Sequence, residues 1–315
     1  MRVLLAFTHL RFGGLSTFNH AIGNELKKRG FIVDVWTNLG GPYRKHIRKD
    51  LNIVRVPDNK YDLIILSNND VVSKLNEYEV EGFKIYITHG VAYKNDIPRK
   101  GMADEYVAIS PFSHAKLYEK TDIPYANYIP QGVDCDRYRP TAPVNRKLTK
   151  VLSLVKSEQA NELIKKACEI RDIELIDWYR SCSSSSIFDI PTAINEADAV
   201  VGWGRVVLET IACGRIPICF DINEAVIENL ETDYPGSFKT STTLPGTILP
   251  ENIYRMGRCN FSLAAGYDPT FDLNRMLESF DKYDYKLSQY YRNYAVNHFN
   301  ITLTVNRFLN LYAQY

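Results

Sequence analysis

One stretch of the sequence joins a glycine-rich turn to an acidic side chain. Residues 201–218 read Val-Gly-Trp-Gly-Arg-Val-Val-Leu-Glu-Thr-Ile-Ala-Cys-Gly-Arg-Ile-Pro-Ile. Gly202 and Gly204 let the backbone turn close to a ligand, and free amides at the start of the following helix would favour an anion. Glu209 lies about one and a half turns inside that helix, near enough to hydrogen-bond hydroxyl groups beside the anion. The pattern predicts a phosphate-binding turn backed by a carboxylate, with an ordinary strand–turn–helix connection as the alternative.

The residues around this turn supply the elements that position it. Residues 198–201 are typical of the end of a buried strand, and residues 206–213 can form about two helical turns. Gly214 then ends the helix, and Pro217 begins a second apolar run that indicates another buried strand.

The first forty residues have the pattern of a βαβ unit. Residues 2–7 form an apolar strand, and residues 31–36 supply a second one. Between them we expect a helix that is capped by Ser16 or Thr17 and runs to Arg29. The sequence therefore predicts a parallel sheet from its first elements.

The loop between the first strand and this helix carries two adjacent glycines, Gly13 and Gly14. It lacks the Gly-x-Gly-x-x-Gly pattern of dinucleotide-binding sites, so a nicotinamide or flavin cofactor is disfavoured. Six cysteines are scattered through the chain with no Cys-x-x-Cys pair and no histidine at metal-ligand spacing. We expect reduced, structural cysteines, no metal site and no cofactor.

The rest of the chain repeats the alternation of strands and helices. A polar, proline-containing passage at residues 139–147 precedes a fresh strand at residues 151–155, which indicates a domain boundary. We expect an α/β protein with domains over residues 1–140 and 141–290, followed by a helical tail over residues 291–315 that could pack back on the first domain. Further strands of the first domain are expected at residues 62–66, 84–88, 105–109 and 126–129.

Composition excludes several classes of protein. The chain has 315 residues, of which 45% are hydrophobic, so disorder is not expected. A formal net charge of +1 disfavours a wholly basic nucleic-acid-binding surface, and the basic cluster at residues 44–49 is typical of a solvated helix face. The first apolar run is too short for a signal peptide, and no stretch is long enough to span a bilayer. We expect a cytoplasmic protein, with peripheral membrane contact left open.

Further segments carry a resemblance to a known family. Residues 103–112 read Ala-Asp-Glu-Tyr-Val-Ala-Ile-Ser-Pro-Phe, and residues 129–140 read Ile-Pro-Gln-Gly-Val-Asp-Cys-Asp-Arg-Tyr-Arg-Pro. Together with the Gly13-Gly14 loop and the glycine turn, they make the chain similar, over most of its length, to GT-B-fold glycosyltransferases of the family-4 type. The resemblance implies two Rossmann-like domains facing a central cleft, with the ligand bound in the crevice between them.

The donor-site signature of that family has two glutamates that flank seven residues, and residues 196–214 resemble it. Only the second glutamate, Glu209, is present, because Val201 occupies the first position. The resemblance implies that Glu209 holds the ribose of the donor. A contact from the first glutamate to the donor sugar is absent.

The expected diphosphate site also departs from the family pattern. The family has Gly-Arg and a later Lys-Gly after the first strand of its second domain, whereas residues 152–160 read Leu-Ser-Leu-Val-Lys-Ser-Glu-Gln-Ala. Lys156 stands for the arginine, and the later lysine has no clear counterpart. Arg205 sits where the signature carries a leucine. We hypothesise that Arg205 supplies part of the missing positive charge, since a guanidinium can hold a phosphate in a bidentate fork.

His89 follows the apolar run 84–88 and precedes Gly90, which places it at the carboxyl end of an expected strand. A lone histidine after a strand is more often structural. The resemblance matches His89 to the family's active-site histidine near the donor sugar, and so implies a catalytic role. His9, in the first glycine loop, is a weaker candidate.

These residues together predict a retaining, metal-independent glycosyltransferase. Gly13, Gly14, Lys156 and the turn from Gly202 to Arg205 would bind the phosphates of a nucleotide-sugar donor. The acceptor could be a glycan, a lipid-linked sugar, a small metabolite, a protein or a modified nucleic acid. One alternative is a non-catalytic protein that binds a nucleotide sugar or a partner, which the missing glutamate and lysine favour. Another is a nucleotide-sugar epimerase on the same fold.

Overall fold

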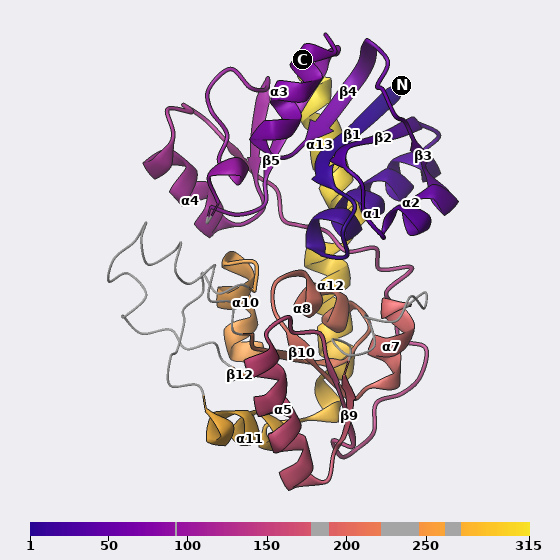
Figure 1. The fold of residues 1–315 in the computed structure, drawn as a ribbon. Helices are drawn as coiled ribbons and strands as arrows, with labels where there is room; N and C mark the ends of the chain where they lie inside the picture. The colour runs from indigo at the N-terminus through magenta and orange to yellow at the C-terminus, as the bar shows by residue number, and fades with distance from the viewer. Residues whose placement is uncertain (92, 178–188, 222–245, 262–271) are drawn as a thin grey trace. The chain divides into compact units, whose positions relative to one another are not determined.

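A computed structural model of the 315-residue chain describes residues 1–91, 93–177, 189–221, 246–261 and 272–315. Contacts between residues divide the chain into two compact α/β units (Figure 1). The first unit comprises Met1–Gly132 and Ile301–Tyr315, and the second comprises Val133–Asn300. The chain thus passes from the first unit to the second and returns for its last helix.

The first unit is built on a parallel sheet. Its strands are β1 (Arg2–His9), β2 (Ile32–Leu39), β3 (Asn52–Ile53), β4 (Lys60–Leu66), β5 (Glu81–Thr88), β6 (Glu105–Ala108) and β7 (Asn127–Tyr128). They lie in the order β3-β2-β1-β4-β5-β6-β7 and pair in parallel throughout. The helices of this unit are α1 (Gly14–Lys28), α2 (Arg44–Asp50), α3 (Asn69–Glu77), the 3-10 turn η1 (Lys94–Asp96), α4 (Pro111–Lys120) and α13 (Ile301–Ala313).

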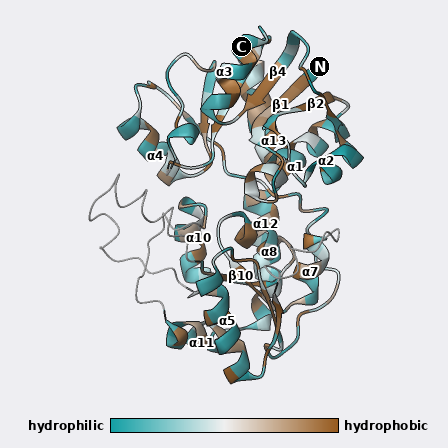
Figure 2. Cartoon of the chain, in the orientation of Figure 1, coloured by the Kyte–Doolittle hydropathy of each residue, from teal (hydrophilic) through white to brown (hydrophobic). Residues whose placement is uncertain are grey.

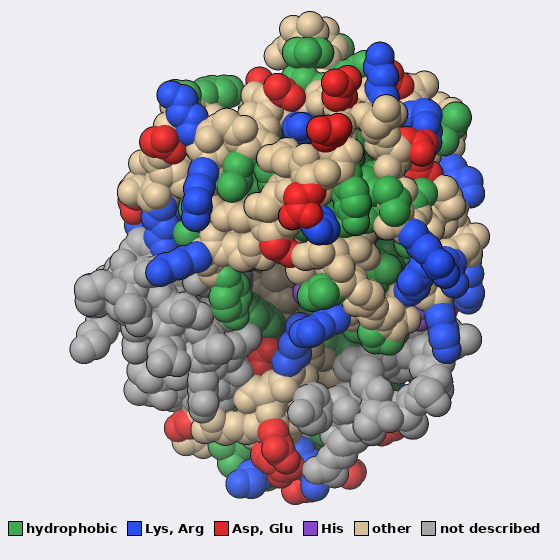
Figure 3. Space-filling model, turned by 45° about the horizontal axis from the view of Figure 1, so that its top comes forward, with side chains coloured by type: hydrophobic (Ala, Val, Ile, Leu, Met, Phe, Trp, Pro, Cys, Tyr) green, Lys and Arg blue, Asp and Glu red, His purple; other side chains and the backbone are tan. Residues whose placement is uncertain are grey.

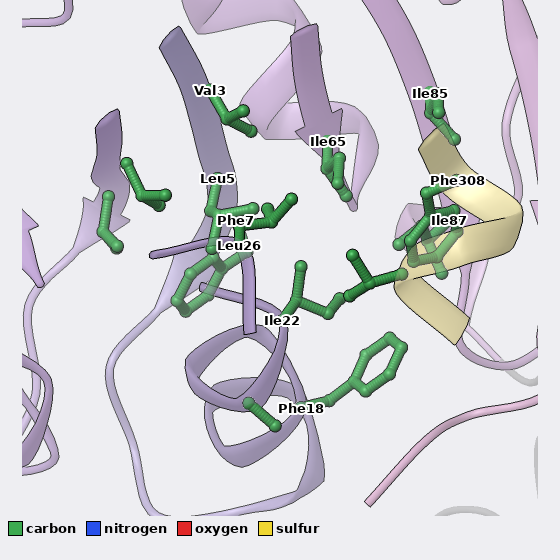
Figure 4. Packing of buried hydrophobic residues seen from close by; sticks show 14 of the residues in the cluster. Val3, Leu5, Phe7, Phe18, Ile22, Leu26, Ile65, Ile85, Ile87 and Phe308 are labelled. Atoms are coloured by element: carbon green, nitrogen blue, oxygen red, sulfur yellow. The ribbon is translucent and has the colours of Figure 1, made fainter. Parts of the chain in front are cut away.

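Alternation of side chains along the strands gives this sheet two apolar faces. On one face, residues of β1 and β5 pack against α1 and α13, as the labelled side chains from Val3 to Phe308 show (Figure 4). On the other face, Leu4, Ala6 and Tyr86 pack with residues of α3 and α4. The strands are accordingly hydrophobic while the outer faces of the helices are largely hydrophilic (Figure 2). Side chains are therefore free to do chemistry mainly where the strands end.

The first helix begins earlier than the sequence predicts. Gly13 precedes the helix with φ 155°, a value that favours glycine, and α1 begins at Gly14. The carbonyl of Gly13 accepts a hydrogen bond from the Thr17 amide at 3.1 Å. Ser16 and Thr17 therefore lie inside the helix, and the expected cap at either residue is wrong. The Ser16 hydroxyl instead donates to the carbonyl of His9 at 3.2 Å.

The second unit holds a smaller sheet. Its strands are β8 (Lys150–Ser153), β9 (Glu174–Asp177), β10 (Ala199–Gly202), β11 (Ile216–Cys219) and β12 (Gly246–Thr247). Their order is β12-β11-β10-β8-β9, and only β12 is antiparallel to its neighbour. The helices are α5 (Glu158–Arg171), α7 (Ile190–Glu196), α8 (Arg205–Ala212), α10 (Pro250–Arg258), α11 (Leu273–Asp281), the 3-10 turn η3 (Tyr285–Leu287) and α12 (Ser288–Phe299).

The boundaries of the units differ from the expected 1–140, 141–290 and 291–315. The Val133 amide donates to the carbonyl of Phe299 at 2.6 Å, so the segment after Gly132 belongs with α12 in the second unit. The expected helical tail therefore divides between the two units, and only α13 packs in the first. A Cβ atom on Gly132 would lie 2.5 Å from Thr304 Oγ1 of α13, so glycine is needed where this helix passes.

The basic cluster at residues 44–49 forms most of α2, in which Lys45, Arg48 and Lys49 are exposed. Acidic and basic side chains are interspersed over the surface in view, with a group of Lys and Arg side chains on its right (Figure 3). Within the described residues, no helix is long and apolar enough to cross a membrane.

Candidate functional site

The carboxyl ends of β8, β10 and β11 meet at one edge of the second sheet, because these strands are parallel. Three polar features follow them. Lys156 comes after β8, the glycine turn after β10, and Asp221 after β11. This edge therefore brings together Lys156, Gly202, Gly204, Arg205 and Glu209 of the expected donor site.

The glycine turn packs tightly onto the helix that it begins. A Cβ atom on Gly202 would lie 2.5 Å from Val206 Cγ1, and Gly204 has φ 59°. Three amides of the turn are already bonded: Gly204 donates to the carbonyl of Phe261 at 2.5 Å, Val206 to that of Trp203 at 3.2 Å, and Val207 to that of Gly204 at 3.1 Å. The expectation that the amides here are free for an anion is therefore wrong for these three.

Glu209 and Arg205 form a buried ion pair one turn apart on α8. Arg205 Nε lies 2.9 Å from Glu209 Oε1, and each side chain is 6% exposed. Burial raises the pKa of Glu209 above its ordinary value, although the charge of Arg205 and a hydrogen bond from Tyr138 act against it. The guanidinium that the sequence assigns to a phosphate thus lies against the carboxylate assigned to a ribose.

The segment after β7 also contacts the carboxylate of Glu209. Asp134 Oδ1 accepts hydrogen bonds at 3.0 Å from the amides of Asp136 and Arg137, which turns the chain there. The charge of Arg137 and the hydroxyl of Tyr138 both stabilise the ionised form of Glu209. Residues 129–140 were expected only as a linker motif, so this contact with Glu209 is one that sequence reasoning missed.

Arg292 of α12 holds that segment against α8. Its guanidinium donates to the carbonyls of Tyr138 and Ala212, each at 2.7 Å, and to the carbonyl of Cys135 at 2.9 Å. Tyr138 is thereby fixed beside Glu209 from a helix more than a hundred residues later in the chain. No local pattern in the sequence marks Arg292.

Lys156 is exposed immediately before α5. Its backbone amide and that of Ser157 donate to the carboxylate of Asp221 at 3.3 and 3.4 Å. The Ser157 hydroxyl caps the helix by accepting from the Ala160 amide at 3.2 Å. Asp221, which is 1% exposed, was also missed. Its only signal in the sequence is its place directly after a buried apolar run.

The remaining predicted residues belong to the first unit. Gly13 precedes α1, Gly14 begins it, and His89 follows β5. His89 Nε2 lies 3.1 Å from Ser67 Oγ, and its ring meets that of Phe18 edge-on, with centroids 5.5 Å apart. Phe18 of α1 and Ser67 after β4 thus hold a half-buried imidazole at the carboxyl edge of the first sheet.

A polar network covers the same edge between α3 and η1. The carboxylate of Asp70 accepts from Thr8 Oγ1 at 3.0 Å, from Asn38 Nδ2 at 3.0 Å and from Asn95 Nδ2 at 2.7 Å. Burial works to raise the pKa of Asp70, but these donors hold it below its ordinary value. Asp96 accepts from Asn68 Nδ2 at 2.5 Å, and burial raises its pKa to about 6. Sequence reasoning singled out none of these side chains.

No family model matches the sequence, and no curated protein matches it. Among solved structures, HepE of Anabaena in complex with UDP and glucose is similar with a TM-score of 0.66 at 11% identity, over 100% of both chains. WaaG, a glycosyltransferase involved in lipopolysaccharide biosynthesis, is similar with a TM-score of 0.56 at 14% identity, over 98% of each chain. The chain has the GT-B fold.

A third structure with this similarity is a putative UDP-N-acetylglucosamine 2-epimerase from Listeria monocytogenes. Its TM-score is 0.56 at 11% identity, over 98% of this chain and 94% of that one. These similarities show the fold alone, which a glycosyltransferase and a putative epimerase share. Across the part of the chain that the structure describes, no group of three or more His, Cys, Asp or Glu side chains could hold a metal ion.

Asp96→Asn is expected to stabilise the protein at neutral pH. The pKa of Asp96 is raised from 3.8 to about 6 by burial, so the folded chain binds this proton more tightly than the unfolded chain. The resulting stability is complete below pH 3.8 and is lost as the pH rises through about 6. A neutral amide avoids that loss and should raise the free energy of unfolding by roughly 1–3 kcal/mol at neutral pH.

Urea unfolding at pH 5 and pH 7.5 measures this difference, which should be larger at the higher pH. Asp70→Asn is the matched control. Because the pKa of Asp70 is lowered, its carboxylate contributes stability above its unfolded pKa, so that variant should be less stable than the natural protein at pH 7.5. An Asp96→Asn gain that is equal at both pH values would contradict the assignment.

Proposed function

We propose that this protein is a retaining, metal-independent glycosyltransferase that moves a sugar from a nucleotide-activated donor to a hydroxyl acceptor. The observation that carries the proposal is the buried Glu209, which lies on the helix after a glycine turn at the carboxyl edge of a parallel sheet. Carboxylate oxygens accept hydrogen bonds from vicinal hydroxyls such as those of a ribose. The structure of HepE in complex with UDP and glucose supports the same class of donor.

The positive charge for the diphosphate is proposed to come from Lys156 and Arg205. Lys156 is exposed at the start of α5, where a flexible ammonium group can reach a phosphate. Arg205 stabilises the ionised form of Glu209 and adds its charge beside the glycine turn. Gly13 and Gly14 are proposed to bring backbone amides close to a phosphate, because glycine has no side chain in the way and tolerates the φ of 155° at Gly13.

The proposed reaction breaks the bond between the anomeric carbon and the β-phosphate oxygen. The acceptor oxygen forms its bond to the same carbon on the face from which the diphosphate leaves, and its proton passes to the departing phosphate oxygen. Negative charge grows on the phosphate while the sugar becomes oxocarbenium-like, so donors that are already in place around the phosphate lower the barrier. His89, held by Ser67 and Phe18, is proposed to contact the donor sugar.

Epimerisation of a nucleotide sugar is the second candidate. The similarity to the putative epimerase from Listeria monocytogenes is the observation that favours it. The two reactions separate in one assay, because an epimerase consumes its nucleotide sugar without any acceptor. A transferase needs an acceptor for full turnover. The acceptor is one of the classes expected from the sequence: a glycan, a lipid-linked sugar, a small metabolite, a protein or a modified nucleic acid.

Nucleotide binding should depend on Glu209. Thermal and urea unfolding with a panel of nucleoside diphosphates and their sugar derivatives should show one selective stabiliser. A ligand at a hundred times its dissociation constant adds about 2.7 kcal/mol to the free energy of unfolding. We expect Glu209→Gln to lose this gain, because an amide accepts hydrogen bonds from the ribose less strongly than a carboxylate.

Glu209→Gln also leaves Arg205 buried without its carboxylate, so urea unfolding of this variant without ligand checks that it is folded before binding is compared. Glu169→Gln, on the exposed side of α5 in the same unit, is the control that should bind normally. A folded natural protein that no nucleotide stabilises would instead support the non-catalytic alternative.

His89→Ala should lower turnover while leaving nucleotide binding unchanged. The imidazole is held at the carboxyl edge of the first sheet by Ser67, and loss of a group that assists the reacting centre costs about 100-fold in rate. Steady-state assays with the donor selected by the panel measure this loss. His298→Ala, which removes an exposed histidine of α12, should retain full activity. Full turnover by His89→Ala would remove this residue from the mechanism.

A further inference from the structure

Asp96 is a carboxylate with few partners at the edge of the first sheet. Its side chain accepts one hydrogen bond from the described residues, from Asn68 Nδ2 at 2.5 Å. Asp70, in the same network, accepts from three side chains. A carboxylate has about four acceptor positions, so Asp96 retains acceptor capacity that its neighbours do not use.

Asn68 bonds Oδ1 of this carboxylate, and the other oxygen, Oδ2, lies near Gly90, the residue after His89. A Cβ atom built on Gly90 would meet one atom of the described residues within 4 Å, and that atom is Asp96 Oδ2 at 3.9 Å. Apart from the chain neighbours of Gly90, no other described atom lies within 4 Å of that position, so the carboxylate borders the space beside Gly90. A ligand group in this space would lie against Asp96 and beside Gly90, the residue that follows His89 in the sequence.

Asn68 supplies the second observation. Its side chain is 7% exposed, and while Nδ2 donates to Asp96, Oδ1 has no hydrogen-bond partner among the described residues. Asn68 also has φ 77° and ψ 140°, a backbone conformation with positive φ that residues other than glycine seldom adopt. A buried amide oxygen without a donor is unfavourable, so a ligand that supplies a donor would be favoured here.

Thr88 adds a hydroxyl from the adjoining strand end. It is the last residue of β5, it is 0% exposed, and its Oγ1 also has no partner among the described residues. By strand alternation Thr88 faces the same side of the sheet as Tyr86, whose hydroxyl donates to Asn69 Oδ1 at 2.9 Å. Thr88 therefore points to the side that α3 and η1 cover, where Asn68 and Asp96 lie.

We propose that Asp96, Asn68 and Thr88 form a subsite that binds adjacent hydroxyl groups of a neutral sugar. The carboxylate and the amide oxygen each accept from a ligand hydroxyl, and the Thr88 hydroxyl can donate or accept. The carboxylates of Asp70 and Asp96 disfavour a phosphate or an acidic ligand at this place. Resting on the proposed function, the inference assigns this subsite to the sugar portion of the acceptor.

Saturation-transfer NMR on the full chain tests the subsite with defined probes, the methyl glycosides of glucose, galactose and mannose. At least one glycoside should give a signal with the natural protein. In Asp96→Ala and Asn68→Ala the same glycoside should bind about tenfold more weakly, the effect of losing one hydrogen bond to a charged or buried partner. Asp122→Asn, at an exposed carboxylate of the same unit, is the matched control and should bind normally.

Stabilisation by the nucleoside diphosphate, measured on every variant, separates the two proposals and shows that each variant is folded. If the nucleotide binds all variants while the glycoside signal falls in Asp96→Ala and Asn68→Ala, both proposals stand. If no nucleotide binds but the glycoside signal still depends on Asp96, the subsite stands and the glycosyltransferase proposal falls. A natural protein that binds no methyl glycoside, or variants that bind as well as the control, would overturn the subsite.

Discussion

The second unit contains a buried carboxylate, Glu209, that needs partners to stabilise its charge. An isolated carboxylate inside a protein is strongly unfavourable, and Glu209 is stabilised there by Arg205 at 2.9 Å and by Tyr138. The position of Tyr138 in turn depends on Arg292, whose guanidinium donates hydrogen bonds both to the carbonyl of Tyr138 and to that of Ala212 at the end of α8. Arg292 of α12 thus joins the segment after Gly132 to α8, on which Glu209 lies.

Polar side chains in both units collect where parallel strands end, because both faces of a parallel sheet are covered by helices. Glu209 at the second edge and Asp96 at the first differ in how fully each carboxylate is paired. Glu209 has cationic and hydroxyl partners, whereas Asp96 has a single amide donor among the residues that the structure describes. Incomplete pairing lowers stability at neutral pH, and such a cost is typical of positions where a ligand completes the hydrogen bonding.

The sequence predicts much of the fold because its apolar runs are short, regular and bounded by glycine and polar residues. The strand β10, the glycine turn and the helix with Glu209 lie within a residue or two of their expected places. The spacing of four residues between Arg205 and Glu209 on a helix is enough to predict that the two side chains pair. Arg292 and Asp96 were not predictable, because their partners come from distant segments that only the folded chain brings together.

The most direct test asks whether Glu209 recognises the ribose hydroxyls. Calorimetric titration would compare the nucleoside diphosphate that stabilises the protein with its 2′,3′-dideoxy analogue, in the natural protein and in Glu209→Gln. A carboxylate that accepts from both hydroxyls predicts a preference of at least about tenfold for the ribonucleotide, and its loss in the variant. An equal preference in both proteins would show that the ribose is bound elsewhere and would contradict the proposed donor site.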